Sequence, residues 1–135
     1  FRRVGGTEDI SGGFRVMVAS SRDLKQEVVA GRFREDLYFR LNILTCLLPP
    51  LRNRIEDIAP LSKRFMMTYG MELGKDVAEI DPAAIAILER HPFPGNVREL
   101  QNVIERAMLA SKGKILTAGD LPWELREMTA LLPVA

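Results

Sequence analysis

Residues 91–100 read HPFPGNVREL, and this stretch separates two helical patterns. Pro92 disfavours helical geometry in the residue before it, and Pro94 has no backbone N–H to donate. Gly95 tolerates φ angles that other residues avoid, so no helix is expected to run through the stretch. Asn96 is a preferred helix-capping residue, and the sequence predicts that a new helix begins there.

The helix after this stretch is expected to bury one face, because its apolar residues recur at spacings of three and four. These residues are Val97, Leu100, Ile104, Ala107 and Met108. Arg98 falls in the first turn, where a cation opposes the helix macrodipole. Free backbone N–H groups are expected beside it, and together with a guanidinium they favour an anion such as phosphate.

The composition is that of a globular protein of ordinary domain size. The chain has 135 residues, of which 47% are hydrophobic and 27% charged, and it has no apolar run long enough to span a membrane. Its net charge of +1 gives no strong electrostatic case for binding nucleic acid. Cys46 is the single cysteine, so an internal disulfide is excluded and a reducing cytoplasm is expected.

The first part of the chain predicts the end of an α/β sheet. Two buried strands are expected, at residues 15–19 and 43–48. Between them the sequence predicts a helix over 24–30, capped by Asp23, and a second helix over 33–41.

The second part predicts helices over 56–73, 82–90 and 97–111. Thr117 is expected to cap a last short turn, and Trp123 to pin a weakly patterned tail. The fold class is therefore an α/β fragment that is predominantly helical. We divide it into an α/β part at 1–53, a helical part at 54–122 and a tail or linker at 123–135.

The sequence does not predict a self-contained active site. No stretch matches the phosphate-binding pattern G-x-x-x-x-G-K-[ST], and no run of four apolar residues is followed by paired acids. One histidine and one cysteine provide neither a zinc site nor a Cys/His nucleophile pair. No metal site is expected.

Four motifs nevertheless occur in an order that resembles one family, the central AAA+ ATPase domain of bacterial sigma-54-dependent transcription activators (NtrC-like enhancer-binding proteins). The motifs are FRRVGG at 1–6, GRFREDLYFRLN at 31–42, LPPLRNRIEDI at 48–58 and PGNVRELQNVIERA at 94–107. The resemblance covers roughly residues 1–122. It implies the last strands and helices of an AAA+ α/β subdomain, followed by a helical lid.

The resemblance also implies roles for individual residues. Arg98 is similar to the sensor II arginine that reaches nucleotide phosphates, and Val97 to its neighbour at the adenine. Arg34 and Arg40 fall on the arginine-finger helix, which acts on the nucleotide of the adjacent subunit. Sensor I falls on Ser20–Ser21, where the family usually has a Thr-Asn pair, and Phe93 replaces the usual tryptophan.

Beyond single residues, the resemblance implies ATP, Mg²⁺, a hexameric or heptameric ring and sigma-54 RNA polymerase as partners of the complete protein. Walker A, Walker B and the sigma-54 loop are expected before Phe1, and a DNA-binding domain beyond Ala135. The chain alone is therefore expected to bind no cofactor tightly and to turn over no ATP.

Each of these residues also has a purely structural reading. Arg34 and Arg40 could be surface charges, with Asp36 and Arg40 forming an i,i+4 pair. Arg98 could pair with Asn102 or Glu105 on its own helix. The serines could cap a strand end, and His91 is expected to be structural, at a helix C-terminus. The methionines 66, 67 and 71, together with Cys46, read as core filling or a plastic interface.

Two rival functions come from other classes. The helices at 82–90 and 97–111 could form a non-enzymatic helix-turn-helix that binds DNA, although Glu99 and Glu105 would repel phosphates. Alternatively, the helical part could be a lid-like module that self-associates through exposed apolar surface.

Overall fold

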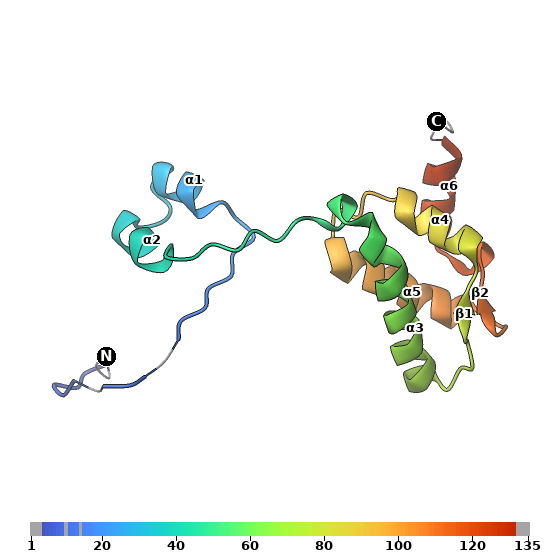
Figure 1. The fold of residues 1–135 in the computed structure, drawn as a ribbon, viewed down its shortest axis with the longest axis horizontal. Coiled ribbons are helices and arrows are strands. Elements are labelled where there is room, and N and C mark those ends of the chain that lie inside the picture. Colours follow the sequence, from blue (N-terminus) through green and yellow to red (C-terminus); the bar gives the residue numbers. More distant parts are fainter. Residues whose placement is uncertain (1–3, 10, 14, 132–135) are drawn as a thin grey trace. The chain divides into compact units, whose positions relative to one another are not determined.

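The computed structural model describes residues 4–9, 11–13 and 15–131, in two compact units that divide between Leu47 and Leu48. Figure 1 shows the elements of both units along the chain. Residues 1–3, part of the first family motif, lie outside the described residues, as does the end of the tail at 132–135. The predominantly helical class predicted from the sequence is confirmed.

The first unit contains two short helices, α1 (Leu24–Val29) and α2 (Glu35–Leu41). Asp23 caps α1 as predicted, because its carboxylate accepts hydrogen bonds from the N–H groups of Lys25 and Gln26 at 3.0 and 3.3 Å. Helix α2 begins two residues later than expected, with acidic residues in its first turn. Gly31 makes the turn between the helices and has a φ of +70°, which glycine adopts at little cost.

The two strands expected in this part are not formed, and that prediction was wrong. Residues 15–19 and 43–48 have no strand partner among the described residues. Their apolar side chains are exposed, for example Met17 at 89% and Leu44 at 92%. A strand is stabilised by the hydrogen bonds of a neighbouring strand, so an apolar run without a partner does not become one.

The second unit is a helical domain built around the packing of α3 (Ile58–Leu73) against α5 (Asn96–Ala110). Two 3₁₀ turns, η1 (Leu51–Asn53) and η2 (Ile55–Asp57), precede α3, and α4 (Pro82–Arg90) lies between the two long helices in the sequence (Figure 1). The apolar face predicted for α5 is buried at Leu100, Ile104, Ala107 and Met108. The other fully buried residues of this core include Leu51, Ile58, Ala84, Leu88, Phe93, Leu116 and Leu121.

A two-stranded parallel sheet ties the ends of the helices together. Strand β1 (Glu79–Ile80) pairs with β2 (Ile115–Leu116) in the register Glu79 with Ile115. Asp81 follows β1 and caps α4 through the N–H of Ala83 at 2.8 Å, as the Asp81–Pro82 pair predicted. Thr117 follows β2 and forms a capping box with Asp120 on the 3₁₀ turn η3 (Ala118–Asp120), so its predicted capping role is confirmed.

Lys75 fixes the far ends of α3 and α5. Gly74 ends α3 with a φ of +63°, and the Lys75 ammonium then donates to the carbonyl oxygens of Met108, Leu109 and Ser111 at 2.7, 2.9 and 2.8 Å. These carbonyls belong to the end of α5, where a cation is favoured by the helix dipole. The contact locks the register of the two core helices.

The chain after Pro122 is helical, which the sequence analysis did not predict. Helix α6 spans Trp123–Leu131 and packs against α4. Trp123 does not pin it, because 58% of this side chain is exposed, whereas Leu125 is buried in the core. Of the three methionines at 66, 67 and 71, Met66 is buried in the core, whereas Met67 and Met71 are exposed. Cys46 is also exposed.

Candidate functional site

Arg98 lies in the first turn of α5 and is exposed. Its guanidinium forms no hydrogen bond or ion pair with any residue that the structure describes, so pairing with Asn102 or Glu105 does not occur. The preceding residue, Val97, is half-buried and packs against the core. The start of α5 thus carries an unpaired cation next in the chain to an apolar side chain.

Val97 lines a shallow hollow of about 340 Å³ together with residues of η2 and α3. Its other lining residues are Arg54, Asp57, Pro60, Leu61 and Arg64. Arg54 lies 3.7 Å from Asp57 in an ion pair, while its Nε is buried without a hydrogen-bond partner among the described residues. The lining thus combines apolar side chains with two arginines and one aspartate, and its excess of positive charge suits a ligand with an apolar part and an anionic part.

The sequence analysis assigned no role to Arg54, Leu61 or Arg64. For Arg54 the sequence does carry a signal, because this residue belongs to the motif at 48–58. The sequence does not predict that η2 and α3 lie close to the start of α5. This proximity depends on the packing of α3 against α5, two helices about 40 residues apart in the chain.

The start of α5 is held by a group of four residues, His91, Phe93, Gly95 and Glu99, which we call the junction cluster. The Glu99 Oε2 accepts a hydrogen bond from the Gly95 N–H at 2.7 Å, and its Oε1 lies 3.7 Å from His91 Nε2. His91 Nδ1 accepts from the Phe93 N–H at 3.1 Å, and the two rings meet edge to face at 4.6 Å. His91 is therefore structural, as expected, and it ends α4.

The expectation of free backbone N–H groups beside Arg98 was wrong for the two residues that begin this turn. The Gly95 N–H is taken by Glu99, and the Asn96 N–H donates to the Phe93 carbonyl at 2.8 Å. An acid of the same helix thus occupies the position that an anion would take. The N–H groups of Val97 and Arg98 donate no hydrogen bond to a described residue, so the expectation holds for these two positions.

Gly95 is required here for space. A Cβ at this position would lie 2.8 Å from the Glu99 Cβ, closer than carbon atoms approach without a shift. The strained backbone lies at its neighbours, because Phe93 has a φ of +42° and Asn96 a φ of +52°. Asparagine tolerates this region better than most residues, whereas phenylalanine does not, and full burial of the Phe93 ring offsets its strain.

Asn96 does not cap α5 with its side chain, contrary to the prediction from sequence. Gly95 is the capping residue, and no side chain provides the cap bond at that position. The Asn96 Oδ1 instead accepts a hydrogen bond from the Leu51 N–H at 2.9 Å. Asn96 therefore joins the start of α5 to η1.

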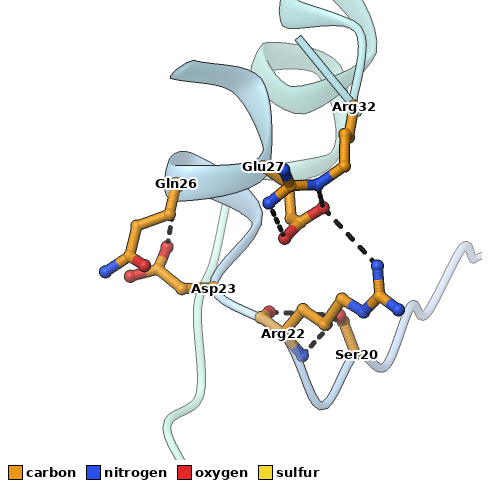
Figure 2. A network of polar contacts seen from close by, with 6 residues as sticks. All are labelled: Ser20, Arg22, Asp23, Gln26, Glu27 and Arg32. Carbon is orange, nitrogen blue, oxygen red and sulfur yellow. Dashed lines mark hydrogen bonds and ion pairs between the residues drawn. The ribbon is translucent and has the colours of Figure 1, made fainter. Parts of the chain in front are cut away.

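In the first unit, Ser20 forms a local turn before α1, as Figure 2 shows. Its hydroxyl accepts from the Arg22 N–H at 3.0 Å and donates to the Arg22 carbonyl at 3.1 Å. Ser21 is exposed and makes no hydrogen bond with any described residue. The structure brings neither serine together with another candidate site residue of this unit.

Glu27 is the centre of the ion-pair network in Figure 2. Arg32 donates to both of its carboxylate oxygens at 2.8 and 2.9 Å, and Arg22 lies 3.6 Å away. The hydrogen bond from Arg32 holds the pKa of Glu27 below its ordinary value, and the same bond raises the pKa of Arg32. The network ties the turn at Ser20 to the segment that leads into α2.

Arg34 and Arg40 lie at opposite ends of α2 and differ in their partners. Arg34 forms two hydrogen bonds to the Asp36 carboxylate at 3.0 and 2.7 Å, which lower the pKa of Asp36. The expected pair between Asp36 and Arg40 is thus replaced by one with Arg34. Arg40 is exposed and forms no hydrogen bond or ion pair with a described residue, so its guanidinium is available.

The described residues contain no group of three or more His, Cys, Asp or Glu side chains that could hold a metal ion. Among them, no helix is long and apolar enough to cross a membrane.

Comparison with known proteins gives matches over nearly the whole chain. Residues 52–132 match the AAA+ ATPase lid domain and residues 1–46 the sigma-54 interaction domain. The chain is 44% identical to the regulatory protein AtoC of Escherichia coli (strain K12), over 94% of this chain and 28% of AtoC. It is 41% identical to the DNA-binding transcriptional regulator NtrC of Rhizobium meliloti (strain 1021), over 93% of this chain and 26% of NtrC.

The solved structure of NtrX from Brucella abortus in complex with ATP matches with a TM-score of 0.81 and 36% identity. This match covers 100% of the chain and 31% of NtrX. The chain therefore spans less than a third of the length of each of these relatives.

Proposed function

The chain belongs to the family of AAA+ ATPase domains of sigma-54-dependent transcription activators, and on this premise we propose that it supplies the nucleotide-reading lid and the arginine-finger helix of such an ATPase. In the complete protein, ATP hydrolysis at the interfaces of a hexameric or heptameric ring would remodel sigma-54 RNA polymerase in the cytoplasm. Contact with DNA would be made by a separate domain.

The observation that carries this proposal is the unpaired guanidinium of Arg98 in the first turn of α5, next in the chain to Val97, which lines the hollow. The adenine of ATP would lie against the apolar side chains of the hollow, Val97, Pro60 and Leu61. The phosphates would be bound by Arg98, since a guanidinium forms strong paired hydrogen bonds with phosphate oxygens. Arg54 and Arg64 add positive charge at the same hollow. The NtrX structure with ATP supports this choice of nucleotide.

Arg40 and Arg34 would act in trans, on the γ-phosphate held by the neighbouring subunit. Arg40 is the stronger candidate because its guanidinium forms no hydrogen bond or ion pair with a described residue and acts on Asp36 only through its charge, whereas Arg34 must first leave Asp36. At sensor I, Ser21 is the freer of the two serines, because the hydroxyl of Ser20 is used in its own turn.

The described residues do not fit a Mg²⁺ site, since no cluster of acidic side chains is present among them. We therefore assign the metal that accompanies ATP to other residues of the complete protein. The chain alone is expected to release no phosphate from ATP.

A titration of the ¹⁵N-labelled chain with ATP, followed by NMR, tests the lid site. Weak binding is expected, with the largest shifts at Val97, Arg98 and Leu61. The Arg98→Ala variant should weaken binding about tenfold, the effect of losing one charge-assisted hydrogen bond.

The matched control is Arg90→Ala, which removes the same charge from an exposed position at the end of α4. This variant should bind ATP nearly as the parent chain does. Equal losses in the two variants, or shifts that avoid the hollow, would contradict the lid role. A phosphate-release assay on the same samples checks for turnover, and robust turnover would contradict the expected inactivity of the chain.

A further inference from the structure

The junction cluster flanks Val97 and Arg98, the two α5 residues of the proposed nucleotide site, in the chain. Glu99 follows Arg98 in the chain, and its carboxylate reaches back one turn to the Gly95 N–H. Its other oxygen faces His91 Nε2 at 3.7 Å, and the side chain of His91 is only 9% exposed. In the chain, Val97 and Arg98 thus lie between Gly95 and Glu99, the two residues that this hydrogen bond joins.

The chemistry of His91 determines which proton faces Glu99. The Nδ1 accepts a hydrogen bond from the Phe93 N–H, so this nitrogen carries no proton in the neutral ring. The single ring proton is then on Nε2, on the side of Glu99 Oε1. The buried Phe93 ring, packed edge to face on His91, prevents the imidazole from turning away.

We propose that Glu99 and His91 are positioning residues for Arg98 and Val97. They fix the first turn of α5, so that Val97 lines the hollow and the guanidinium of Arg98 stays free at the surface. This inference rests on the proposed function, and it adds residues for which that function gives no role.

Simple electrostatics predicts the opposite effect for Glu99. A carboxylate next to Arg98 repels an anionic ligand, so its removal alone should strengthen binding. The positioning role predicts that removal weakens binding, because the loss of a fixed geometry exceeds the relief of repulsion. The sign of the change therefore separates the two explanations.

The first experiment compares Glu99→Gln with Glu105→Gln in the full 135-residue chain. Both variants remove one negative charge from α5, and Glu105 is exposed and outside the junction cluster. In the ATP titration by NMR, Glu99→Gln should bind about tenfold more weakly than the parent chain, which corresponds to one charge-assisted hydrogen bond. Glu105→Gln should bind equally or slightly more tightly. If Glu99→Gln binds as Glu105→Gln does, the proposal is overturned.

Thermal unfolding of the same variants separates positioning from a general loss of stability. Glutamine leaves the Gly95 N–H only a weaker, uncharged acceptor and removes the carboxylate that faces His91. This change loosens the first turn of α5 without altering the core, so the unfolding midpoint of Glu99→Gln should stay close to that of Glu105→Gln. Affinity that falls only in proportion to the unfolded fraction would overturn the positioning role.

A second measurement needs no nucleotide and so remains decisive if the chain binds none. Backbone ¹⁵N relaxation should give order parameters near about 0.85 for Val97 and Arg98 in the parent chain, the value of rigid backbone. Glu99→Ala and His91→Ala should lower them, while Glu105→Ala should not. Unchanged order parameters in the first two variants would overturn the proposal, whereas a failure of ATP binding in the parent chain alone would contradict the proposed function.

Discussion

The hydrogen bond between Asn96 and Leu51 allows a sharp test of the lid structure. Three substitutions of Asn96 separate its two contributions, which are the acceptor oxygen and the tolerance of a φ of +52°. Asn96→Asp keeps both, Asn96→Gly keeps only the backbone tolerance, and Asn96→Ala keeps neither. The order of stability among these variants is therefore fixed by the structure.

The magnitudes follow from the two contacts. Leu51 is fully buried, so an unpaired N–H there should cost about 1–3 kcal/mol. A left-handed backbone at an alanine adds about 1–2 kcal/mol. We expect Asn96→Ala to lose about 2–5 kcal/mol, Asn96→Gly about 1–3 kcal/mol, and Asn96→Asp less than about 1 kcal/mol.

Urea unfolding followed by far-UV circular dichroism measures these losses, and amide hydrogen exchange at Leu51 reports the broken bond directly. Exchange at Leu51 should accelerate in the glycine and alanine variants and remain slow in the aspartate variant. If alanine is no worse than glycine, the left-handed backbone at Asn96 is refuted. If aspartate is as damaging as alanine, the acceptor role is refuted.

Two further variants test the finger helix and the helix ends. In the complete activator, Arg40→Ala should lower ATP turnover by about 10³-fold or more, as for other arginine fingers, and should lower it more than Arg34→Ala does. Lys25→Ala is the control and should keep full turnover. The assignment would be contradicted if both arginine variants turned over ATP as fast as this control. In the chain itself, Lys75→Met removes three hydrogen bonds to the end of α5 and should cost about 1–3 kcal/mol in urea unfolding, whereas the exposed Lys63→Met should cost almost nothing, and equal effects would refute the contact.

Local signals in the sequence predicted the helices well. The helix at 82–90 was predicted with its observed bounds, because Asp81 and Pro82 mark its start and Pro92 forbids its continuation. The buried face of α5 followed from spacing alone. Such signals lie within a few residues of the element that they specify.

Features that depend on distant partners could not be predicted in this way. The Asn96 side chain bonds to Leu51, 45 residues away, so a capping role was the natural expectation from its neighbours. The apolar runs at 15–19 and 43–48 have strand-like composition, yet a strand also requires a partner. The two-residue strands β1 and β2 were missed because they are too short to show a pattern.

The arginines illustrate a different limit, in which two local options compete. Asp36 could pair with Arg40 one helical turn later or with Arg34 just before the helix. Arg34 precedes the helix with an extended backbone, which lets its guanidinium meet the carboxylate through two parallel bonds. The i,i+4 rule applies to two residues within one helix, and it therefore does not account for Arg34, which precedes the helix.

The arrangement at the start of α5 separates stability from recognition in adjacent residues. Glu99 stabilises the helix, because its negative charge lies at the positive end of the helix dipole and its carboxylate accepts a hydrogen bond from the Gly95 N–H. The guanidinium of Arg98 makes no hydrogen bond or ion pair with a described residue, and its charge opposes the same dipole. Arg98 is thus not required by the fold, whereas its neighbours Gly95 and Glu99 are. Such a residue is free to bind a ligand. The position of Arg98 is thus explained by the nucleotide proposed for it rather than by the helix that carries it.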